Sequence, residues 1–239
     1  IPEGGNDNNT RSRSFLFIGF GIFAMTGMDN VSELMVPENG LIALNVPLDE
    51  TRVGSFSTRT THPFYLHLWN EILLGLDLNM HVKNPYWNKT KGEMAVECKN
   101  KDFLYDTMKI SFSCSSPGKA RWKGLSPQHC GYCVPCIIRR AAMHKAFGKD
   151  ETKYTETSIK EMQSKNSEGV GIQLRSFQYA IDKIKKDKKR ALLYIHKPGP
   201  LPQDDGYLKE LADTYIRGLL EVDSFIQDNL IQEDDNNDL

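Results

Sequence analysis

The chain has 239 residues, of which 39% are hydrophobic and 26% are charged. These values are typical of a globular protein with a substantial core, and they exclude a disordered or fibrous chain. The formal net charge of -1 excludes a global positive field that would recruit nucleic acid. We therefore expect one large domain or two smaller ones, and we do not expect nucleic acid as a main partner.

The longest apolar run, residues 15–28, is shorter than the roughly 18 residues that span a bilayer, and glycines interrupt it. A secretory signal has a similar layout, but no small-x-small cleavage site follows this run. Five cysteines, four of them clustered, do not resemble a secreted disulfide framework. We expect a cytoplasmic protein without a membrane partner. The first residue is Ile1 rather than Met, which suggests a processed or truncated piece.

The composition of residues 1–46 predicts the first three elements of the chain. Residues 1–12 are polar and rich in Gly and Asn, which predicts a linker or mobile loop. Residues 14–28 predict a buried helix whose glycines allow close packing. Residues 40–46 form a short apolar run between an Asn-Gly pair and Pro47, which predicts a buried strand of a parallel sheet.

A helix is predicted from Thr61 to Leu76, with Thr61 as its cap and Pro63 in its first turn. Four apolar residues repeat at the helical spacing and are expected to face the core. They are Phe64, Leu68, Ile72 and Leu76.

Residues 80–84 and 108–113 predict two further short strands. Residues 90–98 predict a helix, because Thr90 and Glu93 have the spacing of a capping box. Residues 134–147 predict another helix. Strands that alternate with helices indicate an α/β fold with a mainly parallel sheet.

The composition shifts after residue 148, where a polar stretch of residues 149–168 is followed by two helical patterns, 174–184 and 207–230. We therefore predict two parts, 1–148 and 149–239, of which the second is a helical extension. It is expected to end in a solvated acidic tail of Glu233, Asp234, Asp235 and Asp238. A basic run at 183–190 could suit nucleic acid, but its place on an amphipathic helix favours a solvated face.

The clearest chemical signal is the cysteine cluster. Cys130, Cys133 and Cys136 lie within seven residues, and Gly131 permits a tight backbone between them. Cys114, upstream, is the natural fourth ligand. Four thiolates in a tetrahedron form a closed structural zinc site without an open position for chemistry. An iron–sulfur cluster, buried free thiols and a redox pair stay open as alternatives.

Two further residues, Cys98 and His129, are not expected to be metal ligands. Cys98 is predicted to be a core residue of its own helix, outside the metal site. His129 precedes Cys130 and could compete as a ligand, but a supporting or surface position suits it better.

A set of motifs resembles the QueC family, the 7-cyano-7-deazaguanine synthases, over residues 11–148. The motifs are Arg13-Ser14 before an apolar helix, the run 40–45, Thr90-Lys91-Gly92-Glu93-Met94, Ser113-Cys114, and Cys130-Gly131-Tyr132-Cys133 with Cys136 and Arg139. Residues 57–63 and 129–133, together with the helical extension, resemble the QatC group within this family, from Qat anti-phage operons.

This resemblance implies a PP-loop ATP pyrophosphatase fold, also described as adenine nucleotide alpha hydrolase-like, of which the chain is the carboxy-terminal portion. It implies ATP and Mg²⁺ as cofactors and a carboxylated 7-deazaguanine as substrate, which is adenylated and passed to an amine. The family's Ser-Gly-Gly-x-Asp-Ser loop does not occur in this sequence. We therefore expect a missing amino-terminal ATP-binding segment or chain, and other defence-operon proteins, as partners.

The resemblance also implies binding residues. Arg13 and Lys91 are expected to contact ATP. Arg59 and His62 stand where the family has its substrate segment, just before a helix whose N–H groups favour an anion. The simpler alternatives are a surface arginine at position 13 and an exposed His62 beside a capping Thr61. No catalytic residue is assigned.

The sequence contains no such ATP loop, and a second function therefore stays open. It is a non-catalytic zinc-stapled module that binds a partner protein through the helical extension.

Overall fold

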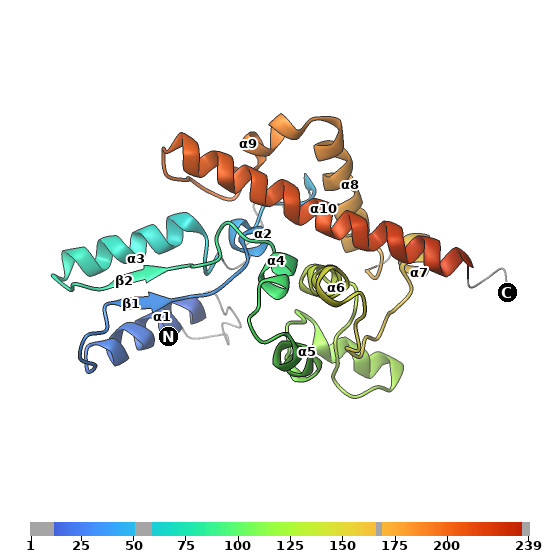
Figure 1. The fold of residues 1–239 in the computed structure, drawn as a ribbon, viewed down its shortest axis with the longest axis horizontal. Helices are drawn as coiled ribbons and strands as arrows, with labels where there is room; N and C mark the ends of the chain where they lie inside the picture. Colours follow the sequence, from blue (N-terminus) through green and yellow to red (C-terminus); the bar gives the residue numbers. More distant parts are fainter. Residues whose placement is uncertain (1–11, 51–58, 166–168, 236–239) are drawn as a thin grey trace, which may run out of the picture.

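A computed structural model describes residues 12–50, 59–165 and 169–235 (Figure 1). Helices dominate these ranges, and the strands form one parallel sheet of two members. Of the predicted α/β fold, the structure shows one small parallel sheet within a mostly helical arrangement. The predicted linker, residues 1–12, lies almost wholly outside the described residues. No helix in these ranges combines the length and apolar character needed to cross a bilayer.

The sheet belongs to a small layer at one end of the molecule (Figure 1). Strands β1 (Glu33–Met35) and β2 (His81–Lys83) pair in parallel, and helices α1 (Arg13–Met25) and α3 (Pro63–Gly75) pack with them. Phe15 of α1 stacks on Trp69 of α3 with ring centroids 4.6 Å apart. The core of this layer consists of Ile18, Ile22, Leu66, Trp69, Leu73 and Val82.

A larger core lies under α10 (Asp205–Asp235), which crosses the molecule and contacts α2, α6, α7, α8 and α9 (Figure 1). The bounds of these helices are α2 Gly40–Leu44, α6 Val134–Phe147, α7 Ile159–Ser164, α8 Ile172–Lys186 and α9 Ala191–Tyr194. Leu44, Ile137, Phe177 and Leu219 meet in this core. The parts predicted on either side of residue 148 therefore share it.

Four further elements are found in the described residues. They are α4 (Lys91–Val96), α5 (Lys101–Ile110) and the 3-10 helices η2 (Pro117–Lys123) and η3 (Lys188–Arg190). The structure confirms several of the elements predicted from the sequence. The capping box of Thr90 and Glu93 begins α4, and α6 has the predicted bounds. The strand predicted at 80–84 is β2.

Two predicted strands are wrong. Residues 40–46 contain helix α2, because the Asn39 side chain accepts a hydrogen bond from the Ile42 N–H at 3.1 Å and caps it. Asn45 then ends the helix with a left-handed φ of 50°. The strand predicted at 108–113 is also absent, since the last turn of α5 runs through Ile110 and irregular backbone follows.

The predicted burial of α1 and α3 needs correction. Phe15, Phe17 and Phe20 on α1 are 54%, 63% and 59% exposed, although the sequence predicted a buried helix. The four predicted core residues of α3 and its end, Phe64, Leu68, Ile72 and Leu76, are also exposed. Leu66, Trp69 and Leu73 are buried instead. Helix α3 is apolar on more than one side, so its periodicity could not identify the buried one.

Glu233 is not part of a solvated tail. Helix α10 continues to Asp235, and the Glu233 carboxylate accepts hydrogen bonds from Ser158 Oγ at 2.8 Å and from the N–H groups of Ile159 and Lys160 at 2.8 and 3.1 Å. It therefore stabilises the beginning of α7 from a distant part of the chain. Asp238 lies outside the described residues.

Candidate metal centre and the cavity beside it

The four predicted cysteines form one cluster. Cys114 follows α5, Cys130 and Cys133 precede α6, and Cys136 lies in its first turn. The Sγ atoms all lie within 4.8 Å of one another, and the Cys114–Cys133 and Cys130–Cys136 pairs are 3.9 Å apart. Sulfurs bound to one tetrahedral zinc at about 2.3 Å are separated by about 3.8 Å. The cluster can therefore hold a metal ion, and its spacing is consistent with zinc.

Backbone N–H groups point at these sulfurs. Ser116 and Cys130 donate to Cys114 Sγ, and Cys133 donates to Cys130 Sγ, each at 3.3 Å. Hydrogen bonds to a thiolate stabilise its charged form. Hydrogen bonds from Cys130 and then Cys136 lower the pKa of the Cys133 thiol, whereas hydrogen bonds with neighbouring cysteines raise the pKa of Cys130 and of Cys136. The surroundings of Cys133 thus favour a thiolate, the form in which a cysteine binds a metal ion.

The turn that holds the cysteines depends on Gly131. Its φ is +88°, and a Cβ added there would lie 2.0 Å from the Glu156 carbonyl oxygen. Two hydrogen bonds fix this approach, from the Thr155 N–H to the His129 carbonyl at 2.8 Å and from the Glu156 N–H to the Cys130 carbonyl at 3.1 Å. Glycine is therefore required both for the left-handed backbone and for the close contact.

Two buried arginines support the same loops. Arg139 donates to Ser111 Oγ at 3.0 Å and to the Met108 carbonyl, which orients the segment before Cys114. Arg140 donates to the Thr157 carbonyl at 2.5 Å and lies over the Tyr154 ring. The arginine of the cysteine motif, Arg139, is thus explained by structural contacts.

His129 and Cys98 lie outside the four-sulfur group. His129 is buried, with Nε2 3.1 Å from the Ser111 carbonyl and Nδ1 3.7 Å from Cys136 Sγ, so it supports the cluster rather than replacing a ligand. Cys98 is partly exposed near the end of α4, so its predicted place in the core is wrong.

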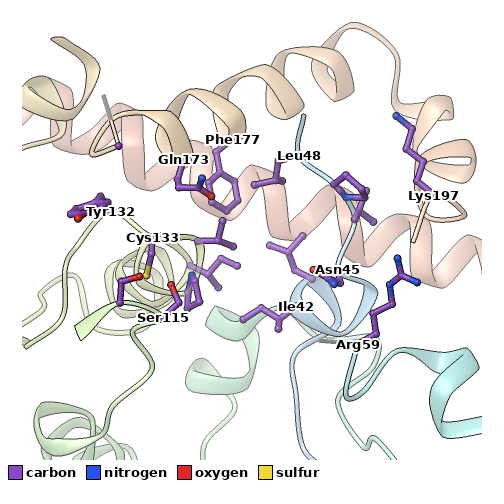
Figure 2. A pocket seen from close by; sticks show the side chains of 18 of the residues that line it. Ile42, Asn45, Leu48, Arg59, Ser115, Tyr132, Cys133, Gln173, Phe177 and Lys197 are labelled. Carbon is purple, nitrogen blue, oxygen red and sulfur yellow. The ribbon is translucent and has the colours of Figure 1, made fainter. Parts of the chain in front are cut away.

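A cavity of about 400 Å³ adjoins the cluster, and Cys133 forms part of its wall (Figure 2). This volume lies within the range of small-molecule sites. Arg59, Lys119 and Lys197 line it, and its described lining contains no aspartate or glutamate. Apolar side chains from three segments form most of the remaining wall. They include Leu41, Ile42, Val46, Leu48, Ile138 and Phe177.

The two predicted substrate residues lie near each other but have different surroundings. Arg59 lines the cavity, whereas His62 is 1% exposed and caps α3, because its Nδ1 accepts the Phe64 N–H at 3.3 Å. The remaining His62 nitrogen, Nε2, then carries the proton, and it has no hydrogen-bond partner within the described residues. Both side chains lie against Gly199, whose added Cβ would be 3.7 Å from His62 Cε1 and 3.9 Å from an Arg59 nitrogen. Thr61 is not the cap.

His62 should make stability depend on pH. Burial, and then the charge of Arg59, lower its pKa from 6.5 to about 4. Between these values the unfolded chain binds a proton that the folded chain does not, so stability falls as the pH drops from 7 to 4. The loss of stability due to His62 at pH 4 is on the order of 3 kcal/mol.

Urea unfolding at pH 7 and pH 4.5 measures this effect in the parent and in His62→Asn, which keeps a capping oxygen. The variant should lose less stability on acidification. His67→Asn, at an exposed histidine of α3, is the control. An equal pH dependence in all three proteins would contradict the assignment.

The two predicted ATP residues also lie apart. Arg13 lines a second, more open cavity of about 450 Å³ with Ser14 and Thr60, next to Val36 at the carboxyl end of β1. Lys91 begins α4 and lines neither cavity. The assignment of both to ATP stays a prediction.

The beginning of α4 already holds an anion from the chain itself. The Glu221 carboxylate accepts hydrogen bonds from Thr90 Oγ1 at 2.5 Å, the Gly92 N–H at 2.8 Å and Lys145 Nζ at 3.1 Å. A Cβ at Gly92 would meet this carboxylate at 2.5 Å. The Thr-Lys-Gly-Glu motif is therefore explained, in part, by the contact between α4 and α10.

Comparison with protein-family models, with curated proteins and with solved structures finds no match for this chain.

Proposed function

We propose that this chain is the metal-binding and substrate-binding part of a QueC-like enzyme of an anti-phage system. Joined to an ATP-binding half, it activates the carboxylate of a 7-deazaguanine and passes the acyl group to an amine. The observation that carries this proposal is the cavity beside the cysteine cluster, which has three cationic side chains and no carboxylate in its described lining.

The chemistry of the cavity fits a flat, carboxylated heterocycle. Arg59 can bind a carboxylate through two parallel hydrogen bonds. Apolar walls, with Phe177 among them, favour an uncharged ring system over a sugar or a polyanion. A structural metal site next to the cavity would keep its wall rigid, because Cys133 belongs to both.

Neighbouring residues of the sequence line the two cavities, since Arg59 lines the first and Thr60 lines the second. This supports adenylation, in which a carboxylate oxygen attacks the α-phosphorus of ATP and pyrophosphate leaves. An amine then attacks the acyl carbon and AMP leaves. The second cavity lies where parallel sheets commonly bind ligands, at the carboxyl end of a strand, and we place the nucleotide and its Mg²⁺ there, beside Arg13.

The ATP-binding half, as a segment or a chain, would cover the apolar side of α1. Four phenylalanines of α1 are more than half exposed, and Phe23 is the most exposed of them at 76%. Two-stranded parallel sheets are rarely left without further strands, because parallel sheets are normally buried on both faces. Other proteins of the same defence operon are the further partners that we propose.

Replacement of Arg59 by alanine tests the proposal. In a full-length protein, release of AMP with 7-carboxy-7-deazaguanine should fall by a factor that corresponds to roughly 2–3 kcal/mol of transition-state stabilisation. Metal content and melting temperature should not change, because Arg59 is exposed and precedes α3. The matched control is Arg175→Ala, an exposed arginine of α8 outside the cavity lining. Unchanged AMP release in Arg59→Ala would remove this residue from the site.

The second candidate, a non-catalytic module that binds a partner protein, is favoured by the exposed apolar residues of α1 and α3. The same assay separates the two functions. The isolated 239-residue chain serves as the blank, since it has no ATP loop. A full-length protein that contains that loop and still releases no AMP would favour the module.

A further inference from the structure

The two ends of the cavity beside the cysteine cluster differ in charge. Figure 2 shows Arg59 and Lys197 at one end and Tyr132 and Cys133 at the other. One zinc ion with four thiolates carries a net charge of about -2. Lys119, whose Nζ lies 5.4 Å from the centroid of the Tyr132 ring, offsets only part of this charge. The cavity therefore runs from a cationic end to an end that is net negative when the metal is bound.

This difference in charge sets the direction in which a carboxylated ring lies. The carboxylate is stable at the cationic end, where Arg59 can bind it through two parallel hydrogen bonds. The opposite edge of the ligand then faces the negative end, which attracts the positive ends of N–H groups. In 7-carboxy-7-deazaguanine, the 2-amino group lies on the edge away from the carboxylate and therefore points toward the cysteine cluster.

Two carboxamide side chains, Asn45 and Gln173, line the cavity between its ends. Figure 2 shows Asn45 beside Arg59 and Gln173 on the side of Cys133. Asn45, which ends α2, thus belongs to the end that receives the carboxylate. Gln173 is the carboxamide that the far edge of the ring would meet.

Helix α8 presents Gln173 and Phe177 on one side, because residues four apart lie one turn apart on a helix. Both line the cavity, so an apolar wall and a hydrogen-bonding group come from one element. The start of α8 is held closely against α7. A Cβ added at Gly171 would lie 2.3 Å from the carbonyl oxygens of Met162 and Lys165. Gln173 is therefore presented from a well-supported backbone.

The chemistry of Gln173 suits the edge of a guanine-type ring. Its carboxamide oxygen has two lone pairs, so it can accept a hydrogen bond from a ligand in addition to a contact within the chain. A planar carboxamide can also bind two neighbouring atoms of a ring edge at once. Other side chains at this end are less suited, since Lys119 has donors only and Ser115 hydrogen bonds to the Cys133 sulfur.

We propose that Gln173 selects the ring, because its carboxamide oxygen accepts a hydrogen bond from the 2-amino group of a ligand whose carboxylate lies against Arg59. This inference rests on the proposed function and deepens it. Selection of a 2-amino-4-oxopyrimidine ring is then a property of the helical extension and not of residues 11–148, which carry the QueC-like motifs. A site that hydrogen-bonds a substrate group rejects the analogue that lacks this group, because the acceptor in the site loses its partner.

Calorimetric titration of the zinc-loaded chain with 7-carboxy-7-deazaguanine and with 7-carboxy-7-deazahypoxanthine, which lacks only the 2-amino group, tests this inference. The parent should bind the guanine form about tenfold more tightly or better. Gln173→Met keeps the length of the side chain and removes its hydrogen-bonding groups, so it should weaken the guanine form alone and abolish the preference. Its zinc content should equal that of the parent.

The matched control is Gln178→Met, a partly exposed glutamine of α8 outside the cavity lining, which should keep the preference. Arg59→Gln should weaken both ligands equally, because both carry the carboxylate.

Equal affinity of the parent for both ligands would overturn the inference and leave the proposed function standing. A Gln173→Met variant that keeps the preference, or that weakens both ligands equally, would overturn it as well, because Gln173 would then only shape the wall. If the parent binds neither ligand, or if Arg59→Gln changes neither affinity, the proposed function itself fails.

Discussion

Replacement of Cys133 by serine is expected to remove zinc from the protein and to unfold a large part of the chain at room temperature. Zinc binding to four thiolates contributes about 10–16 kcal/mol in small folded sites. Typical domains are stable by only about 5–15 kcal/mol. Cys133 belongs to the larger core together with Cys130 and Cys136, so loss of the metal would leave buried thiols that no longer hold the loop to α6. Metal analysis and thermal unfolding by circular dichroism measure both effects, and the parent should contain one zinc per chain.

Cys98→Ser is the control for this prediction, since Cys98 is partly exposed and lies outside the four-sulfur group. It should retain both the zinc and the melting temperature of the parent. Iron with the absorbance of a sulfide-bridged cluster would assign a different centre to the same cysteines. A parent protein without any metal would refute the prediction outright.

Gly131→Ala should be the most damaging of the glycine substitutions around the cluster. The added Cβ would lie 2.0 Å from the Glu156 carbonyl oxygen in a backbone with φ +88°, so the turn between Cys130 and Cys133 would have to move. We expect a loss of at least about 3 kcal/mol, the range of strain and overpacking combined. For a chain of this size, this lowers the melting temperature by roughly 6–12 °C. Zinc affinity should fall as well.

Gly148→Ala separates the effect of the left-handed backbone from the effect of the close contact. Its φ is +67°, but nothing lies within 4 Å of the added Cβ. Only the cost of a left-handed alanine remains, about 1–2 kcal/mol. Zinc affinity should not change in this variant. If both substitutions lowered the melting temperature equally, the close approach of Gly131 to Glu156 would have no part in the stability of the turn.

Sequence patterns that involve only a few neighbouring residues predicted the structure of this chain well. The capping box of Thr90 and Glu93 depends on one turn of backbone, and it begins α4 as expected. The spacing of Cys130, Cys133 and Cys136 likewise fixes three ligands through local geometry, and the structure gathers them with Cys114. In both cases the interacting residues lie close together in the sequence, so their spacing is enough to predict the contact.

Features that depend on distant contacts were not predictable. Residues 40–46 are apolar in a run too short to distinguish a strand from a buried helix, and the helix α2 that they contain packs against the distant α10. The cavity combines Arg59, Lys119 and Lys197 from three separate segments, and neither lysine stands in a pattern that marks a site. Which side of α1 and of α3 is buried depends on the elements that pack against each helix.

The many contacts of helix α10 affect how the protein unfolds locally. It borders α2, α6, α7, α8 and α9, and its Glu221 and Glu233 side chains hold the beginnings of α4 and α7. A helix with so many neighbours cannot detach without exposing the larger core. Backbone amides in these elements would then exchange with solvent through one shared opening, so that the metal loop and the carboxy-terminal helix behave as a single cooperative unit.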